Sequence, residues 1–486
     1  MNDEYNNKEA FKIIDKHRFV SIKADHAGSG KSQMCLAYVI ERVLKPIMKK
    51  YKNEVKIDRE KAMEKIKSEF RASHIIACPQ NAQAAEIQYK TIEELETNGF
   101  HAVTTYMLCG KVLNDDGEIE NGVLTTNNNY KVCILEEYGQ YAVEEWNMVQ
   151  DYIKKCPKTK FIDNGDVNQC APVEEYINPA IDKDTYYNNI NNSIFKYQIL
   201  LKEPKRYASE ELKQKAMKMK EDLIDKKLDQ IKILKSFAKK IEIHNIPTNA
   251  ICISYLQDTR RDMNEYMHRK VIGNGTRYFK GLILRANTRL YIHEYKYQIQ
   301  KNYDFEVSDV KDDCIELTEI LTGFKFIVDK KYYNNFSLPY AFTGHSQQGR
   351  SVSNPVVIFD YDFYHVDRKW LYVALTRNRN LDVYYCDYKF VQKMDQQDLQ
   401  NKIQGYKYQD RNAGRAFNDE EFITSQWYYI QSTKQGHKCY LCQEVMNMKN
   451  IEGDGLNHTA DRLDNSLPHL KFNCKLCCLK CNISKK

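Results

Sequence analysis

One loop, residues 24–32 with the sequence ADHAGSGKS, constrains the fold of this chain more than any other feature. A loop ending in Gly-Lys-Ser binds phosphate when an apolar strand precedes it and a helix follows it, because backbone N–H groups and the helix N-terminus must face the anion. Residues 19–22 supply the strand, and residues 33–44 have the apolar spacing of a helix. We therefore expect an α/β fold built around a phosphate-binding loop.

Within this loop, Lys31 is expected to reach the β- and γ-phosphates and Ser32 to hold Mg²⁺. The glycine that usually opens such a loop is replaced by Asp25. That position makes no essential phosphate contact and the following AGSGKS is intact, so we predict a working nucleotide site. The predicted nucleotide-binding residues are Gly28, Ser29, Gly30, Lys31 and Ser32.

A second apolar run, residues 131–135, ends at Glu136 and Glu137, and FIDNGDVNQ (161–169) ends at Gln169. In nucleotide hydrolases the first acid after such a strand holds Mg²⁺ through water, and the second positions the attacking water. The pattern predicts these roles for Glu136 and Glu137. The alternative is a strand that ends on solvated carboxylates.

Composition limits the class of protein. Hydrophobic residues make up 42% of the 486, no run of 18 apolar residues could span a bilayer, and residues 1–12 lack an apolar signal core. We expect an intracellular protein, in the cytoplasm or nucleus of a host, with no membrane partner. The net charge of +7 permits a nucleic-acid partner without requiring one.

The ordered motifs resemble those of superfamily 1 helicases. Gly-Lys-Ser, Glu-Glu and GDxxQ are followed by AFTGHSQQGRS (341–351) and WLYVALTRNRN (370–380), and LLKEPKRYA (200–208) resembles the family's short motif with one functional arginine. IIACPQNAQAAE (75–86) and TTYMLCG (104–110) resemble the segments that grip the nucleic-acid strand. The resemblance covers roughly residues 15–390.

This resemblance implies two RecA-like domains, residues 1–200 and 201–390, that clamp ATP and Mg²⁺ between them and step along single-stranded DNA. It also implies a small β-barrel at about 275–335, as in RecD-like members, which usually move 5′ to 3′. Gly349 of the T-x-H-x-x-Q-G-x-S motif joins the cofactor-binding set. The catalytic residues it implies in the cleft are Lys31, Glu136, Glu137, Gln169, Arg206 and Arg377.

Two polar stretches carry no motif. Residues 209–243 are lysine-rich with a helical pattern, which we interpret as solvated helix faces in preference to a nucleic-acid track. Residues 391–430 are polar and predict a helical or flexible spacer. The adenine-binding glutamine found upstream in many such helicases is missing from residues 1–23, so nucleotide choice is relaxed or the base stacks on Phe19.

Six of the fifteen cysteines lie in the last fifty residues, which predicts a separate module at 431–486. Cys439-x-x-Cys442 and Cys478-x-x-Cys481 have the spacing of two zinc knuckles, so these four thiolates are the predicted Zn²⁺ ligands. Cys474 and Cys477 form a competing second pair. We expect a small zinc-bound α+β module.

The string NHTADRLDNSLPHLKFNCKLCCLKCNISKK (457–486) resembles zinc-stapled HNH endonucleases of phages and large DNA viruses. The resemblance implies His469 or His458 as the general base and Asp461 and Asn482 as contacts of a divalent metal. Arg462 stands where many HNH enzymes have the catalytic His. Two alternatives therefore stay open: a DNA-nicking tail, or a zinc module that only binds nucleic acid.

Taken together, the motifs predict an ATP-dependent DNA helicase of viral or mobile-element type, with replication proteins as candidate partners. One alternative is an RNA helicase of an RNA virus, which would have RNA as its strand. Another is a non-catalytic nucleic-acid loading factor.

Overall fold

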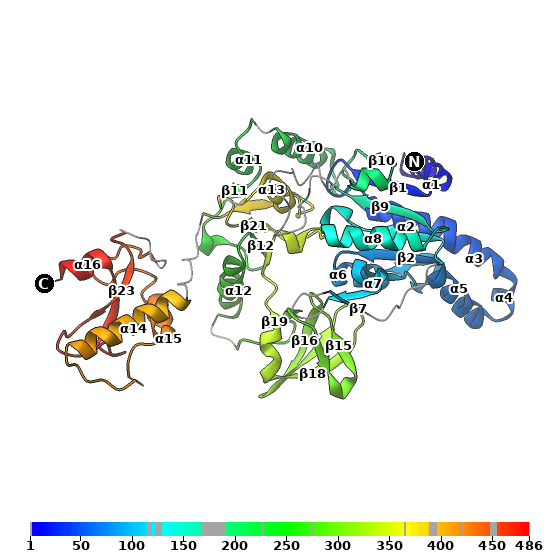
Figure 1. The fold of residues 1–486 in the computed structure, drawn as a ribbon. Coiled ribbons are helices and arrows are strands. Elements are labelled where there is room, and N and C mark those ends of the chain that lie inside the picture. The colour runs from blue at the N-terminus through cyan, green and yellow to red at the C-terminus, as the bar shows by residue number, and fades with distance from the viewer. Residues whose placement is uncertain are drawn as a thin grey trace. The chain divides into compact units, whose positions relative to one another are not determined.

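The computed structural model of the chain comprises two compact units, residues 1–387 and 388–486 (Figure 1). Among the described helices, none is long and apolar enough to cross a membrane. The residues that the structure describes are 2–113, 119–121, 129–166, 169, 190–225, 227–273, 276–363, 366–387, 396–419, 421–447 and 454–485.

The first domain of the first unit is built on a six-stranded parallel sheet. Its strands, in pairing order, are β10 (Tyr197–Leu201), β1 (Phe19–Ala24), β9 (Lys160–Gly165), β8 (Val132–Leu135), β2 (His74–Cys78) and β5 (Ala102–Thr104). The helices between them are α1 (Asn2–Lys16), α2 (Lys31–Val39), α3 (Lys45–Lys50), α4 (Lys52–Ile57), α5 (Arg59–Ser73), α6 (Asn81–Gln88), α7 (Thr105–Leu108) and α8 (Val143–Lys155). Two short hairpins, β3 (Thr91–Ile92) with β4 (Thr97–Asn98) and β6 (Lys111–Leu113) with β7 (Ile119–Asn121), lie outside the sheet.

Apolar residues bury both faces of this sheet, as continuous apolar strands in a parallel sheet require. Ile76 and Ile134 pack on one face with α1, α2 and α5, whereas Ile75 and Cys133 pack on the other face with Trp146 of α8. Each strand therefore contributes alternate side chains to two separate cores. This two-sided burial holds the strand ends, and the loops that follow them, in fixed positions.

The second domain has a five-stranded parallel sheet of its own. Its strands, in pairing order, are β11 (Lys239–Lys240), β22 (Val383–Tyr385), β21 (Val356–Ile358), β12 (Ile251–Ser254) and β20 (Ala341–Thr343). Its helices are α10 (Glu210–Ile224), α11 (Gln230–Phe237), α12 (Gln257–Ile272) and α13 (Arg368–Leu375). The helices α10, α11 and α13 share one apolar core with β21 and β22.

An antiparallel five-stranded sheet is inserted between β12 and β20 of the second domain, where Figure 1 shows it as a separate layer. Its strands, in pairing order, are β18 (Lys325–Asp329), β17 (Cys314–Glu319), β16 (Asp304–Val310), β13 (Ile283–Ala286) and β19 (Phe336–Ser337), and the hairpin of β14 (Leu290–Ile292) and β15 (Tyr297–Ile299) adjoins it. The β-rich insertion expected at about 275–335 is therefore present. In the part of the chain that the structure describes, β18 and β19 stay unpaired with each other, so closure into a barrel remains a prediction.

The second unit contains α14 (Gln396–Asn412), α15 (Ser425–Lys434), the antiparallel pair β23 (His458–Arg462) and β24 (Cys474–Cys478), and α16 (Leu479–Ser484). Leu399, Ile403 and Tyr406 of α14 are buried in one core with Leu476. Residues 391–430 were predicted to be a helical or flexible spacer. Within that range α14 is a helix, but it packs into the second unit through this apolar face and is not a spacer. Residues 391–395 and 420 of that spacer lie outside the described residues.

Candidate nucleotide site and metal centre

Three segments of the first domain meet at one edge of its sheet. Because neighbouring strands are parallel, the carboxyl ends of β1, β9 and β8 lie side by side, which is where ligands bind in open α/β sheets. The phosphate loop follows β1, Glu136 and Glu137 follow β8, and Gln169 lies shortly after β9. The sheet topology therefore brings the predicted nucleotide residues together.

The phosphate loop has the conformation that its glycines permit. Gly28 and Gly30 have φ angles of 76° and 86°, in the left-handed region that side chains with a Cβ rarely adopt. A Cβ at Gly28 would lie 2.5 Å from the Cβ of Arg206, so this glycine also makes room for the arginine. Ser29 is buried and its hydroxyl donates to the His26 carbonyl at 2.5 Å. The Ser29 side chain thus stabilises the loop itself.

Ser32 and Glu136 form a pair suited to a hard divalent cation. The Ser32 hydroxyl donates to Oε2 of Glu136 at 2.6 Å, and Oε1 of Glu136 is buried without a hydrogen-bond partner among the described residues. Burial raises the pKa of the Glu136 carboxyl to about 7, and the neighbouring Glu137 adds to the shift. A hydroxyl beside an unsatisfied buried carboxylate oxygen fits Mg²⁺, which prefers oxygen ligands.

Lys31 lies 3.7 Å from Oε1 of Glu137, and both side chains are largely buried. Glu137 has a φ of 49°, and its N–H donates to Oδ1 of Asn164 at 3.3 Å. Gln169 donates to Oδ2 of Asp166 at 3.1 Å, while its own Oε1 is buried without a partner in the described part of the chain. The described contacts therefore place the Lys31 ammonium beside the Glu137 carboxylate, and the Gln169 amide beside Asp166, at the same edge of the sheet.

The two predicted arginines lie in the same cleft but are held differently. Arg206 donates one hydrogen bond to the Thr376 carbonyl at 2.5 Å, whereas the fully buried Arg377 donates to the carbonyls of Val373, Gln347 and Arg350 at 2.7 to 3.1 Å. Burial lowers the pKa of Arg377 to about 10, and the charge of Arg206 contributes to that shift. Arg377 is thus fixed in the second domain, while Arg206 lies against the phosphate loop.

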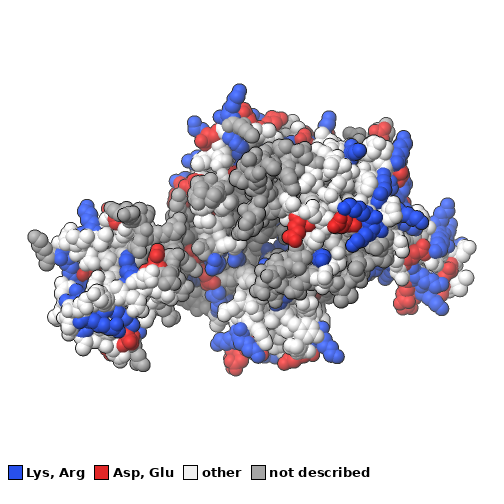
Figure 2. Space-filling view, in the orientation of Figure 1, with Lys and Arg blue, Asp and Glu red and all other residues white. Residues whose placement is uncertain are grey.

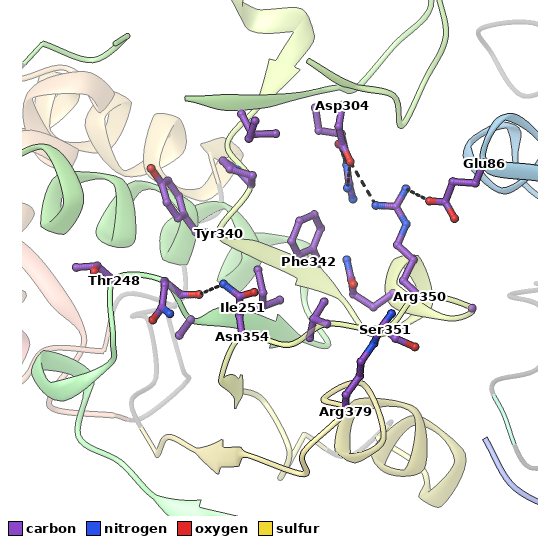
Figure 3. Close-up of a pocket in the computed structure, with 18 residues that line it drawn as sticks. Glu86, Thr248, Ile251, Asp304, Tyr340, Phe342, Arg350, Ser351, Asn354 and Arg379 are labelled. Atoms are coloured by element: carbon purple, nitrogen blue, oxygen red, sulfur yellow. Dashed lines mark hydrogen bonds and ion pairs between the residues drawn. The ribbon is translucent and has the colours of Figure 1, made fainter. Parts of the chain in front are cut away.

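Gly349 is the glycine of the T-x-H-x-x-Q-G-x-S motif that we predicted for the cofactor-binding set. It lies in the wall of a cavity of about 700 Å³ between the second domain, the inserted sheet and α6 (Figure 3). A Cβ at Gly349 would lie 2.5 Å from the side-chain nitrogen of Gln83 on α6. In the structure Gly349 therefore lines this cavity and contacts α6, and its place in the cofactor-binding set stays a prediction.

Arg350 joins three parts of the first unit across this cavity. Its guanidinium lies 3.7 Å from Glu86 of α6 and 3.5 Å from Asp304 of the inserted sheet, as Figure 3 shows. Arg285 makes a bidentate ion pair with the same Asp304 at 2.6 and 2.8 Å and stacks over Phe342. The cavity therefore has a cationic wall whose arginines are already positioned.

A second cavity, of about 380 Å³, lies between the first domain and the β14–β15 hairpin. Asn81 and Tyr106, from the two segments that resemble strand-gripping motifs, line it together with Arg289, Gln298 and Gln300 of the hairpin region. On the face in Figure 2, positive and negative side chains are interspersed over the described surface. This second cavity therefore brings together polar side chains of the two strand-gripping segments and of the hairpin region.

Sequence reasoning missed two residues of the second domain that contact the phosphate loop. Lys220 of α10 forms an ion pair with Asp25, and the Tyr372 hydroxyl of α13 accepts a hydrogen bond from the Ala27 N–H at 2.7 Å. We had assigned the lysines of 209–243 to solvated faces. The available signal was that Lys220 falls on the same helical stripe as the apolar Ala216 and Leu223.

In the second unit, the sulfur atoms of Cys439, Cys442, Cys478 and Cys481 all lie within 4.8 Å of one another. Burial alone would raise the pKa of Cys439, but N–H groups of Cys442, Cys478 and Leu441 lower it to about 7. Hydrogen bonds with Cys478 and Cys442 raise the pKa of Cys481 to about 12. The number and mutual distance of these sulfur atoms fit the tetrahedral four-cysteine set of structural Zn²⁺, which binds cysteine in its deprotonated form.

The competing cysteine pair lies elsewhere. Cys474 and Cys477 are on β24 and buried in the apolar core, where burial raises the pKa of Cys474 to about 12. Neither belongs to the group of four sulfur atoms that lie within 4.8 Å of one another, so both are packing residues of this core. The structure thus favours Cys478 and Cys481 as the second half of the ligand set.

The residues expected to form a nuclease centre have other partners. His469 is buried, its Nδ1 lies 2.7 Å from Asp410 of α14, and its ring stacks on Tyr406 at 4.5 Å. His458 Nδ1 is 2.9 Å from the Tyr428 hydroxyl, and it too is buried.

The predicted metal contacts are occupied as well. The Asp461 carboxylate accepts hydrogen bonds from Tyr440 and Lys485, and Asn482 donates to Thr459 at 3.1 Å. Within the described residues, the cysteine cluster is the one group of three or more His, Cys, Asp or Glu side chains whose ligand atoms lie close enough together to hold a metal ion. The geometry therefore indicates a structural role for His469, which is the hydrogen-bond partner of the buried Asp410 carboxylate.

No protein-family model matches the sequence, and no curated protein matches it. Solved structures are similar in fold. The Pif1 helicase from Bacteroides in complex with ADP-AlF3 and ssDNA aligns with a TM-score of 0.50 at 14% identity, over 83% of this chain and 97% of that one.

Two further structures align less well. Bacteroides Pif1 bound to ssDNA aligns with a TM-score of 0.48 at 14% identity, over 83% of this chain and 97% of that one. Pif1 helicase from Candida albicans aligns with a TM-score of 0.45 at 12% identity, over 79% and 94%. The two parallel sheets, with the antiparallel sheet inserted between β12 and β20 of the second, thus form an α/β architecture similar to that of the Pif1 helicase of Bacteroides.

Proposed function

We propose that this chain is an ATP-dependent DNA helicase or translocase of superfamily 1. The observation that carries the proposal is the convergence of predicted residues from both domains on one cleft. Lys31, Ser32, Glu136 and Glu137 come from the first domain, and Arg377 comes from the second. A cleft with this set of charges is suited to phosphoryl transfer, which depends on positioning and on neutralising spread negative charge.

In this proposal Lys31 follows the γ-phosphate, and Arg206 and Arg377 stabilise the charge that develops on it. Glu137 accepts a proton from the attacking water, and Gln169 orients that water. Ser32 and Glu136 would hold Mg²⁺, which neutralises charge on the β- and γ-phosphates when bound. Because the two arginines lie at the boundary with the second domain, hydrolysis and release would change how the domains close.

The candidate path for the strand runs through the two cavities beside the inserted sheet. Tyr106 offers an aromatic face on which a base can stack, and Arg289 of the same cavity is the candidate cationic group for the backbone. In this proposal Gly349 lines the larger cavity of the path, where the absence of a side chain leaves room for Gln83 of α6. A RecD-like barrel and 5′-to-3′ movement remain part of this proposal.

The test is unwinding of duplexes that carry a 5′ or a 3′ single-stranded tail, with ATP and Mg²⁺. We expect unwinding of the 5′-tailed DNA only, and ATP turnover stimulated more by single-stranded DNA than by RNA. Stronger stimulation by RNA would favour the alternative of an RNA helicase. A protein that binds DNA but neither unwinds it nor hydrolyses ATP would be a loading factor, which would contradict the proposal.

For the second unit we propose a zinc module that binds nucleic acid. The observation that favours binding over cleavage is the engagement of both candidate bases, His458 and His469, with other buried groups. Incubation of the protein with duplex, branched and single-stranded DNA in Mg²⁺ or Mn²⁺ tests this. We expect no nicking; cleavage that is lost in His469→Ala while zinc is retained would establish the nuclease alternative.

A further inference from the structure

Three consecutive residues at the start of the phosphate loop are in contact with, or buried near, the second domain. Asp25 pairs with Lys220 of α10, and the Ala27 N–H donates to Tyr372 of α13. His26, between them, is 5% exposed, and its Nε2 lies 3.8 Å from Asp25. These contacts indicate that the second domain fixes the conformation of residues 25–27, with which the phosphate loop begins.

The burial of Lys220 explains why a carboxylate is needed here. Lys220 is only 6% exposed and lies on α10 between Met219 and Leu223 on the buried side of the helix. A buried ammonium destabilises a protein unless an opposite charge compensates it. In the described part of the chain, its ion-pair partner is Asp25, which belongs to the other domain.

The backbone of the loop tolerates this aspartate. Asp25 is absent from the residues with positive φ, unlike Gly28 and Gly30, so no glycine is required at its position. The Asp25 N–H donates to the Leu201 carbonyl of β10 at 2.9 Å, which fixes the residue at the end of the β1–β10 pair. The first sheet therefore positions the Asp25 carboxylate where Lys220 of the second domain pairs with it.

The segment that links the domains contacts the same loop. The N–H groups of Lys205 and Arg206 donate to the Gly28 carbonyl at 2.9 and 3.1 Å. Arg206 is one of the two arginines proposed to act on the γ-phosphate. A shift of the second domain that separated Lys220 from Asp25 would act on the phosphate loop through positions 25 to 28.

We infer that Asp25 and Lys220 form a positioning ion pair that stabilises the closed arrangement of the two domains and aligns the phosphate loop with Arg206 and Arg377. This inference rests on the proposed ATP hydrolysis in that cleft. The pair acts through the loop and touches no nucleotide. Opening of the cleft would separate the buried Lys220 ammonium from its carboxylate, so the pair favours the closed form in which hydrolysis occurs.

The test is a double-mutant cycle on DNA-stimulated ATP hydrolysis. We expect Asp25→Lys and Lys220→Asp each to lower kcat about tenfold with a change in KM for ATP of less than about threefold. The reversed pair Asp25→Lys with Lys220→Asp should recover most of the loss. Lys218→Asp is the matched control, because Lys218 lies on the same helix but is exposed.

Thermal unfolding of the same variants supplies a readout that needs no activity. We expect the two single changes to lower the midpoint and the reversed pair to restore it. Additive losses in both kcat and midpoint would overturn the inference. Coupling in the midpoint without any ATP turnover by the wild-type protein would instead retain the ion pair and refute the proposed function, so the two failures are distinguishable.

Discussion

The nucleotide cleft and the cysteine cluster are assembled in opposite ways. The cluster takes its four sulfur atoms from two short segments, 439–442 and 478–481, that approach through local turns and one hairpin. The cleft draws residues from β1, β8 and β9, from the segment at 205–206 and from α10 and α13, which belong to different sheets. One site is set by spacing along the chain, and the other depends on how two domains pack.

This difference predicts how each region fails. Loss of one ligand from a compact metal site removes the energy that holds a small unit together. Loss of one charge from the cleft leaves both sheets folded and changes only the chemistry or the closure of the domains. The two regions should therefore be separable by mutation, and the experiments below use that separation in order of decreasing effect.

Removal of the metal should have the largest effect, confined to the second unit. Structural zinc contributes on the order of 10–16 kcal/mol to the folding of small domains. We expect one zinc per chain, and we expect chelation or Cys442→Ser to make residues 388–486 sensitive to protease while ATP hydrolysis persists. Cys474→Ala is the control that keeps the zinc. Loss of zinc in the control, or loss of ATP hydrolysis on chelation, would contradict the separation.

Substitution of the arginines should affect the cleft alone. We expect Arg206→Ala and Arg377→Ala each to lower kcat by about 10³, the typical contribution of an arginine that stabilises the transition state, with ATP affinity little changed. Arg377→Ala should also lower the unfolding midpoint of the first unit, because three carbonyls lose their donor. Equal stability of the two variants would contradict the structural part of this prediction, and unchanged kcat would contradict the catalytic part.

His469→Ala should destabilise the second unit by about 1–3 kcal/mol, because Asp410 loses a buried hydrogen-bond partner. Zinc content and ATP hydrolysis should stay unchanged. Asn482→Ala is the comparison, since Asn482 is half-buried and makes a single side-chain bond. Urea unfolding followed by a probe in the second unit measures both. A wild-type midpoint for His469→Ala would show that the buried pair is not structural.

A smaller, pH-dependent effect is expected in the cleft. Since the pKa of Glu136 is raised to about 7, its contribution to stability is complete below the ordinary carboxyl pKa and is lost as pH rises through 7. Mg²⁺ requires the ionised carboxylate, so Mg²⁺ affinity should rise with pH, by up to about tenfold per unit, and level off above 7. Titration of Mg²⁺ at several pH values tests this. Glu136→Gln should remove the pH dependence, and an unchanged slope would refute the assignment.

A site that depends on local spacing can be predicted from the sequence more completely than a site that depends on how two domains pack. The cluster was predicted down to the choice of Cys478 and Cys481, because ligand spacing is local. The acids after β8 were predicted because a parallel sheet fixes where strands end. Lys220 and Tyr372 were missed, since only the packing of the second domain brings them to the loop. The cofactor-binding role of Gly349 stays a prediction.

The boundary of the second unit shows a related limit. Residues 396–412 look polar in composition, and only their buried side, with Leu399, Ile403 and Tyr406, joins them to the core. Three apolar residues on one face of a polar helix do not distinguish a spacer from a packed helix. His469 was likewise predicted as a base from a motif, although its burial beside Asp410 depends on that same helix.

The central claim is that the cleft hydrolyses ATP when a strand is bound, and Lys31→Ala tests it most directly. Lys31 lies in the loop at the start of α2, beside Glu137, where it can follow the γ-phosphate into the transition state. The measurement is the rate of ATP hydrolysis with and without single-stranded DNA. We predict DNA-stimulated turnover in the wild-type protein and none above background in a Lys31→Ala protein with an unchanged unfolding midpoint. Wild-type turnover in that folded variant would contradict the account.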